Sequence, residues 1–530
     1  MTPSISRLTV PRLALAAMAL ACVASISARA QDAVPQTSTL HVSTRLVVLD
    51  IVVTDAKGRP VDNLSQKDFQ IFEDDKLQDI RSFESPSAHL PSSSSPDEAE
   101  TAAQPLDPAH PAAFGTTPVT VLVFDQLNTH FADSAYARRQ LHDYIAAQPA
   151  HLVLPTELLT VYENGFQQLA GFTHDRDALL HALDATPTKQ AWTLELSGKA
   201  ANGPAIRLEQ SVRALQQIAE SAAPIRGRKN LVWIGGGFPT IDPQVIDGPD
   251  AKEIKDGLQR MTNLLLDTRV TLYSVDPSTT AAGMTEITDA QQLSFAQLAG
   301  NEVAGGGDPY SATDDFDRLG PITGGRVIRG MNNITAQIAQ SVDLGSNYYT
   351  LAYRPTSNSD TPGKYRKIRV VSLRPGLTVT TRNGYYEATP ALEATNEAVS
   401  YDLSTAAESS VPLNALHVTV EPDYSVAAPE EAYIIHVGSA QLTWQPNADG
   451  TSTAHVAVLA AFLTKQDKLV AHVLHGMTAS ARSGINLQDS TKVANFNFEL
   501  VPKAKAAKLR FVVRDAATGR MGTFDMPLTK

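Results

Sequence analysis

The spacing of hydrophobic and polar positions changes along the chain. From Leu40 to Glu84, the runs "LHVSTRLVVLDIVVTD" and "DFQIFEDDKLQDIRSFE" carry β-branched residues around turns, which predicts a small β unit. From Val119, near-continuous apolar runs alternate with segments of helical spacing, the pattern of a parallel sheet covered by helices on both faces. Short alternating strands return after residue 346 and continue, with little helix signal, to Lys530. The pattern predicts an α/β domain with β units before and after it.

The central region divides into elements of ordinary length. Strands are expected at 119–125, 158–164, 166–172, 230–236, 270–276 and 325–330. Helices are expected at 134–147, 175–183, 207–221, 251–267 and 334–344, several with Asp or Asn near the start as caps. This alternation predicts a doubly wound α/β domain.

The composition of the connecting segments sets the domain organisation. We expect a signal peptide (1–30), an N-terminal β unit (38–86), a Ser/Pro/Ala-rich linker (87–117), the α/β domain (118–345), further strands (346–388), a second linker (389–410) and a C-terminal β-sandwich (411–530). The first linker is too poor in large apolar residues to form a core and is expected to be mobile. The strands on either side of the α/β domain could pair into one β unit into which that domain is inserted.

The first thirty residues resemble an export signal. Arg7 and Arg12 precede the apolar run "LALAAMALACVASIS", and the small residues "ARA" place cleavage after Ala30. No later segment reaches about 18 uncharged apolar residues, so we expect no transmembrane span and a periplasmic or extracellular protein. The only cysteine, Cys22, lies in this segment, so the mature chain has no thiol. Lipidation at Cys22 remains an alternative.

Charge and motifs exclude several classes of function. The 530 residues carry a net charge of −12 without a cluster of Lys and Arg, which argues against nucleic acid as a partner. The histidines lack a His-Glu-x-x-His arrangement, and no Gly-x-Ser-x-Gly elbow is present. His472 and His475 lie three apart on an expected strand and should face opposite sides of it. The sequence therefore predicts that the protein is not an enzyme.

Several blocks carry a family resemblance. They are "LVVLDIVVTDAKGRPVDNLSQKDFQIFEDDKLQDIRSFE", "VLVFDQLNT", "GRKNLVWIGGGFP", "LGPITGGRVI", "YYTLAYRPT", "YRKIRVVSLRPG" and "RNGYY". In this order they resemble the von Willebrand factor type A (VWFA) domain, and more narrowly the VWFA-related domain proteins described from Acidobacteria. The resemblance covers about Leu40 to Tyr386 and implies a protein-interaction role. The C-terminal region lies outside it.

The resemblance also implies a candidate metal site. Metal-binding type A domains carry an Asp-x-Ser-x-Ser motif after the first strand, a Thr from a second loop and an Asp after the fourth strand. Asp125 matches the first Asp, and Thr129 can stand for the last hydroxyl. Asn128 offers an amide oxygen one residue out of register. Hard divalent cations prefer such oxygen ligands, so Asp125, Asn128 and Thr129 are the candidate ligands for a weakly held Mg²⁺ or Ca²⁺.

The chain departs from the family motif at the other ligand positions. Leu127 occupies the place of the first Ser, and Gly235 or Gly236 stands where the fourth-strand Asp is expected. The second-loop Thr has no clear match. The site is therefore interpreted as degenerate, with no tightly bound cofactor, and Asp125 is interpreted as a structural carboxylate that accepts hydrogen bonds from loop amides.

These observations favour an exported, non-enzymatic, adhesion-type protein that binds another protein through the loops at the carboxyl edge of its type A domain. A metal-dependent adhesin and a scaffold for envelope assembly are the alternatives. A hydrolase acting on an exported polymer would need a nucleophile or an acid/base pair, and none is located. The sequence identifies neither the partner nor the oligomeric state.

Overall fold

The computed structural model describes most of the chain. The described residues are 46–89, 106–108, 113–162, 165–188, 204–239, 248–278, 318–329, 333–356, 363–387, 396–425, 431–465, 467–503 and 506–528. The expected signal peptide and Cys22 lie outside them. Within these ranges, no helix is both long and apolar enough to cross a membrane.

A six-stranded sheet forms the centre of the α/β region. Its strands are β5 (Val119–Asp125), β6 (His151–Tyr162), β7 (Gly165–Asp175), β8 (Lys229–Ile234), β9 (Val270–Val275) and β10 (Arg326–Ile328), in the order β10-β9-β8-β5-β6-β7. Neighbouring strands are parallel except β7, which runs antiparallel to β6. Every residue of β5, β8 and β9 is buried, which explains why their sequences are near-continuous apolar runs.

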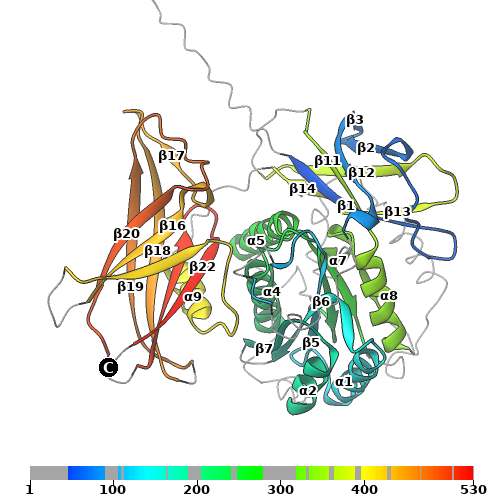
Figure 1. Cartoon of the computed structure of the whole chain (residues 1–530), viewed down its shortest axis with the longest axis horizontal. Coiled ribbons are helices and arrows are strands. Elements are labelled where there is room, and N and C mark those ends of the chain that lie inside the picture. Colours follow the sequence, from blue (N-terminus) through cyan, green and yellow to red (C-terminus); the bar gives the residue numbers. More distant parts are fainter. Residues whose placement is uncertain are drawn as a thin grey trace, which may run out of the picture. The chain divides into compact units, whose positions relative to one another are not determined.

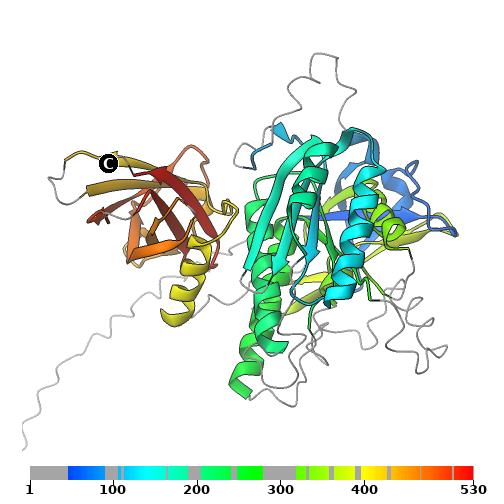
Figure 2. The same ribbon diagram turned by 90° about the horizontal axis from the view of Figure 1, so that it is seen from below.

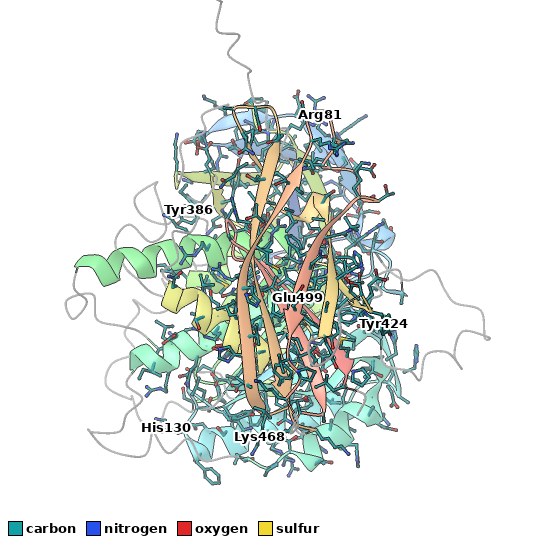
Figure 3. The ribbon with its side chains drawn as sticks, turned by 90° about the vertical axis from the view of Figure 1, so that its left-hand side faces the viewer. Arg81, His130, Tyr386, Tyr424, Lys468 and Glu499 are labelled. Carbon is teal, nitrogen blue, oxygen red and sulfur yellow. The ribbon has the colours of Figure 1, made fainter. Side chains whose placement is uncertain are left out.

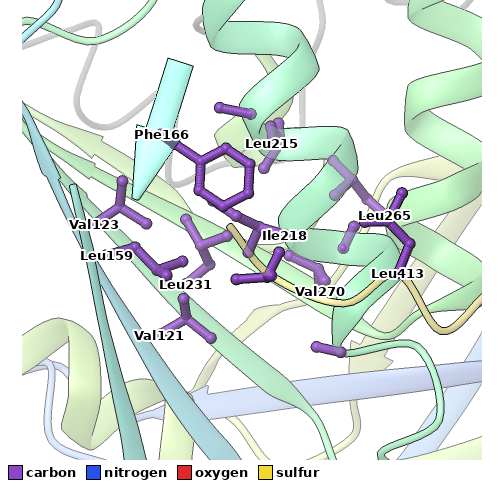
Figure 4. Close-up of a cluster of buried hydrophobic side chains, with 14 of the residues drawn as sticks. Val121, Val123, Leu159, Phe166, Leu215, Ile218, Leu231, Leu265, Val270 and Leu413 are labelled. Carbon is purple, nitrogen blue, oxygen red and sulfur yellow. The ribbon is translucent and has the colours of Figure 1, made fainter. Parts of the chain in front are cut away.

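Helices pack on both faces of this sheet (Figures 1 and 2). The helices are α1 (Phe131–Ala146), α2 (Arg176–Ala185), α4 (Pro204–Ser221), α5 (Gly248–Asp267), α7 (Leu319–Ile322) and α8 (Ile334–Ser346). Alternate residues of β5 join different cores: Leu122 packs with α1, α2 and α8, whereas Val121 and Val123 pack with α4 and α5. Figure 4 shows the second core, where Leu215 and Leu265 from the helices approach the sheet. The region is a mixed α/β structure built on a parallel-strand sheet.

Strands from before and after the α/β region share two further sheets. Their members are β1 (Val47–Thr54), β2 (Phe69–Glu73), β3 (Lys76–Gln78), β4 (Ile80–Glu84), β11 (Tyr349–Tyr353), β12 (Tyr365–Ser372), β13 (Thr378–Thr380) and β14 (Gly384–Tyr386), in the orders β13-β1-β11-β4 and β14-β12-β2-β3. Leu49 lies opposite Leu351 in one sheet, and Ile71 lies opposite Val370 in the other. The two segments are therefore paired strand to strand, with the α/β region between them in sequence.

A buried ion pair joins β1 to the turn between α5 and β9. The Arg269 guanidinium donates two hydrogen bonds to the Asp50 carboxylate, and the Asp50 side chain is 4% exposed. Burial alone would raise the pKa of Asp50, but the charge and hydrogen bonds of Arg269 hold that pKa below its usual value. Removing one partner would leave a buried charge uncompensated, so this pair ties the β strands firmly to the α/β region.

In the described part of the C-terminal region there are one α-helix and two sheets. The elements are α9 (Asn396–Ala407), β15 (Val418–Asp423), β16 (Glu431–Gly438), β17 (Gln445–Pro446), β18 (Ser452–Leu463), β19 (Leu469–Ala481), β20 (Val493–Leu500), β21 (Lys508–Asp515) and β22 (Met521–Pro527). One sheet has the order β15-β16-β20, and the other has β17-β18-β21-β22 with β19 also paired to β18. A shared apolar core includes Ile435, Val458 and Phe511. Figure 3 looks onto these strands.

The second predicted linker contains helix α9, so that part of the prediction is wrong. Leu403, Ala406 and Ala407 of this helix are fully buried in the apolar core that also contains Leu459 and Val512. Two alanines and one leucine suffice to anchor the helix because small side chains allow close packing. A segment with so few large apolar residues does not show helical periodicity clearly.

Described parts of the first predicted linker also pack against the protein. The His89 ring stacks on Tyr348 with centroids 4.4 Å apart. The amide of Leu106 donates to the Phe172 carbonyl of β7 at 2.7 Å, and the Phe114 ring meets the Phe172 ring edge-on. The expectation of a mobile linker does not hold for these residues, because isolated apolar side chains find sites on the sheet edge.

Candidate functional site

The candidate site lies where the strand order reverses. β5 and β8 are neighbours, and the connection after β5 leads to β6 on one side, whereas the connection after β8 leads to β9 on the other side. Asp125 is the last residue of β5, and its neighbour Phe124 lies opposite Ile234, the last residue of β8. Ligands of open α/β sheets bind at such a crevice, so Asp125 lies where a ligand is expected.

The Asp125 carboxylate is saturated by donors from the protein itself. Its Oδ1 accepts the backbone amides of Leu127 at 2.8 Å and Asn128 at 3.1 Å. Its Oδ2 accepts the Trp233 indole N–H at 3.0 Å and the Asn128 amide group at 3.4 Å. The Asp125 side chain has no exposed surface. Both oxygens are therefore engaged in internal hydrogen bonds.

Burial raises the pKa of Asp125 from 3.8 to about 6. The hydrogen bonds from Trp233, Asn128 and Leu127 oppose this rise, because they stabilise the charged form. The carboxylate is thus ionised at neutral pH and depends on these donors for its stabilisation.

The turn after β8 packs directly against the Asp125 loop. Thr129 Oγ1 donates to the Asp125 carbonyl at 2.6 Å and accepts the Gly236 amide at 2.9 Å. A Cβ on Gly235 would lie 2.5 Å from Asp125 Cβ, and one on Gly236 would lie 2.1 Å from the Asn128 carbonyl oxygen. Only glycine allows this approach, so the residues at the expected fourth-strand Asp position serve close packing.

The three candidate metal ligands are brought together, but their oxygens are mostly committed. Asn128 donates from Nδ2 to Ser211 Oγ of α4 at 2.8 Å, and its buried Oδ1 has no hydrogen-bond partner. In the described ranges, no group of three or more His, Cys, Asp or Glu side chains is arranged to hold a metal ion. A divalent cation needs about six oxygens, and Asn128 Oδ1 is the unpaired one among the three candidates, so these residues do not fit a tight metal site.

Trp233 and Ser211 were not identified from the sequence. Trp233 is 108 residues from its partner Asp125, and Ser211 is 83 residues from its partner Asn128. No local spacing in the sequence therefore links either residue to this loop. One signal was available for Trp233: an indole in a buried strand normally finds an acceptor for its N–H, and a carboxylate at the end of the neighbouring strand is a natural partner. Ser211 sits on a helical face and gave no comparable signal.

The rim beside Asp125 presents an exposed aromatic residue. Phe131, the first residue of α1, is 45% exposed. Near it, Asp133 interacts electrostatically with His130 and Asp276, and Asp276 forms an ion pair with Arg329. We name these five residues the carboxyl-edge surface. It combines one apolar side chain with charged and polar neighbours.

A second hollow lies away from this edge. It has a volume of about 970 Å³, and its lining includes Glu220, Asp402, Arg514 and Arg520. Glu220 is fully buried, Gln216 donates to its Oε1 at 3.0 Å, and its Oε2 has no hydrogen-bond partner. Burial raises the pKa of Glu220 to about 8, so this side chain is protonated at neutral pH. No motif or spacing along the chain points to this acid.

The comparisons with known proteins yield distant likenesses. No family model and no curated protein matches the chain. Among solved structures, the VWA domain of SpRpn10 is similar at 18% identity and a TM-score of 0.18, over 30% of this chain and 74% of that one. Bacteroides uniformis β-glucuronidase 2, bound covalently to cyclophellitol-6-carboxylate aziridine, is similar at 10% identity and a TM-score of 0.14, over 34% of this chain and 19% of that one. TM-scores this low support no inference about function.

Proposed function

We propose that this chain is an exported, non-enzymatic binding protein with a type A domain, flanking β units and a C-terminal β-sandwich. In this proposal the metal site of the family is replaced by internal hydrogen bonds. The carboxyl-edge surface then binds a protein partner without a cation. The sheet order, the position of Asp125 at the strand-order reversal and the export signal in the sequence support this proposal.

The observation that carries the proposal is the saturation of Asp125. Leu127, Asn128 and Trp233 supply donors to both carboxylate oxygens, and the side chain is fully buried. A carboxylate that coordinates a cation must direct an oxygen toward the cation. A carboxylate of a partner protein can complete the coordination only if the partner can reach the cation. Binding through this edge therefore has to use other groups.

The carboxyl-edge surface offers those groups. Phe131 is exposed, His130 and Asp133 lie close to it in sequence, and Asp276 and Arg329 are linked electrostatically to Asp133. An apolar side chain with polar neighbours is typical of protein interfaces. Aromatic anchors of this kind often contribute more than 1 kcal/mol to binding. At this edge of an α/β sheet the loops can differ in sequence, while the strands fix the positions of the loop ends.

A metal-dependent adhesin is the second candidate, because one observation favours it. The buried Asn128 Oδ1 lacks a partner and lies on the loop that holds Asp125. A weakly held cation could use that oxygen if the Asp125 loop opened. This candidate predicts partner binding that chelators abolish. An envelope-assembly scaffold differs from the adhesion role in taking its partner from the same cell.

Photo-crosslinking in the producing cell tests the proposal. A photo-reactive amino acid replaces Phe131 in one variant and Val153 in the other. Val153 is also exposed, at 61%, but lies near the start of β6, at the opposite edge of the sheet. We expect a discrete protein adduct from position 131 that persists in EDTA, and none from position 153. Equal adducts from both positions, or loss of the adduct in EDTA, would overturn the proposal.

A further inference from the structure

Strand β19 is a long strand with a free edge. It spans thirteen residues, Leu469–Ala481, and pairs antiparallel with β18 on one side. In the described part of the chain, no strand pairs with its other side. Backbone amides and carbonyls along that side lack a ladder partner, and such an edge is a ready template for another strand.

β19 lacks the charged residues and prolines that protect many edge strands, and its pairing with β18 is irregular only at Val470. Its sequence, "LVAHVLHGMTASA", contains no Asp, Glu, Lys, Arg or Pro. Other edges are protected: β15 ends in "EPD", β22 carries Asp525 and Pro527, and the edge of β7 is bridged by Leu106. Charges, prolines and covering segments are the devices that stop strands from pairing between molecules. Among the described edge strands of five or more residues, β19 is the one that has neither charges nor proline.

The core beneath β19 is incompletely covered. Ala471, Val473 and Met477 face the shared core of the two C-terminal sheets and remain partly exposed. On the outer face, Leu474 is 37% exposed. Burying these side chains against another strand would add apolar contact to the new backbone hydrogen bonds.

We propose that β19 pairs with β19 of a second copy of this chain, antiparallel and about a two-fold axis, so that the two sheets become continuous. A self-pairing of this kind uses the same edge on both molecules and leaves neither edge free. Because the strand is uncharged, no like charges face each other along it. A second copy is also a partner that always presents a strand of matching length.

Flanking charges disfavour the register centred on the midpoint of the strand, His475. Lys468 and Arg482 lie just outside the strand, and Figure 3 labels Lys468. An axis at His475 would place Lys468 opposite Arg482 of the other copy, which is repulsive. An axis at Leu474 places Lys468 opposite Ser480 and brings the two Leu474 side chains together. We infer the second register.

Sedimentation of the chain spanning residues 31–530 tests the dimer. We expect a concentration-dependent dimer that Leu474→Lys weakens by at least about tenfold, because it places two lysines face to face. The control is Ile485→Lys, at a residue that is 42% exposed and lies outside β19, which should leave the dimer unchanged. A monomeric mass up to about 100 µM, or a dimer that Leu474→Lys does not weaken, would overturn the proposal.

A single cysteine tests the register independently of dimer strength. Cys22 is the only native cysteine and precedes residue 31, so an introduced thiol is unique in the chain used here. Leu474→Cys should form an intermolecular disulfide under mild oxidation. Tyr424→Cys, at a residue that is 89% exposed, should form little. Equal disulfide yields from the two variants would contradict pairing at Leu474. A partner from another protein on this strand would appear as a hetero-adduct and would equally overturn self-pairing.

Discussion

Asp125 and Glu220 are both fully buried acids in the α/β region, and they are held very differently. Asp125 has donors on both oxygens from Leu127, Asn128 and Trp233. Glu220 has a donor on one oxygen and none on the other. The pKa rises to about 6 for Asp125 and to about 8 for Glu220. Dense internal donors keep a buried acid ionised, and sparse donors leave it protonated.

This contrast bears directly on function. Asp125, the acid that the type A resemblance assigns to a metal, holds its own loop. Glu220, the acid that retains an unpaired oxygen, lies beside a separate hollow. A carboxylate at a metal position is therefore informative only together with its hydrogen-bond partners. The following changes test whether the two acids differ in the way described.

Asp125→Ala should produce the largest effect. It removes the acceptor for the amides of Leu127 and Asn128 and for the Trp233 indole, and unsatisfied buried donors cost about 1–3 kcal/mol each. We expect a loss of about 3–4 kcal/mol in the free energy of unfolding, measured with urea. Asp79→Ala, at an 85% exposed side chain, should change it by less than about 0.5 kcal/mol. A loss below about 1 kcal/mol for Asp125→Ala would contradict the structural role.

Glu220→Gln should remove a pH dependence of stability. The pKa of Glu220 is about 8 in the folded chain and near 4.5 when unfolded, so between these values the folded state holds a proton that the unfolded state has released. The stability contributed by Glu220 therefore falls as pH rises from about 4.5 to 8. One pKa unit corresponds to about 1.4 kcal/mol, so we expect the free energy of unfolding to fall by roughly 2–4 kcal/mol across this pH range.

The comparison for this pH effect is made with two further variants. Glu408→Gln, at an exposed residue, should leave the decline unchanged. Glu157 is also fully buried, and burial raises its pKa to about 7. Its contribution to stability should therefore stop falling near pH 7, about one pH unit below that of Glu220, and Glu157→Gln should remove this contribution. Urea unfolding at each pH from 4.5 to 8 measures all three. Identical pH profiles for the native chain and Glu220→Gln would show that Glu220 is not protonated in the folded state.

Gly236→Ala should have a smaller but clear effect. The added Cβ would lie 2.1 Å from the Asn128 carbonyl, so the turn after β8 must move away from the Asp125 loop. We expect a loss of about 2 kcal/mol in the free energy of unfolding. Gly476→Ala is the matched control, because a Cβ there meets no atom within 4 Å. Similar losses in the two variants would mean that the close approach is not required.

Much of the α/β core could be predicted because its signals are local. The run from Val119 to Asp125 forms β5 with the expected bounds, since every one of its residues is buried and the apolar run is unbroken. The predicted helix 334–344 corresponds to α8, Ile334–Ser346, with Asn333 as its N-cap. Helix α9 was missed because its buried residues are mainly alanines, which carry little periodic signal.

The site was predictable only in part. The position of Asp125 at a strand end and the resemblance to type A domains point to Asp125, Asn128 and Thr129, and hydrogen bonds join Asn128 and Thr129 to Asp125 in the structure. What the carboxylate does depends on Trp233, which is supplied by another strand. Contacts of this kind arise from the sheet order, so they cannot be read from the spacing of residues along the chain.

The most direct test of the central claim is the thermal midpoint of residues 31–530 in EDTA and then with excess Mg²⁺, Ca²⁺ or Mn²⁺. A cation that binds only the folded state raises the midpoint, and the rise grows with its concentration. We predict that no cation shifts the midpoint by more than about 1 °C, because the Asp125 oxygens are already engaged. A rise of several degrees that disappears in Asp125→Asn would show that the loop holds a metal and would contradict the account.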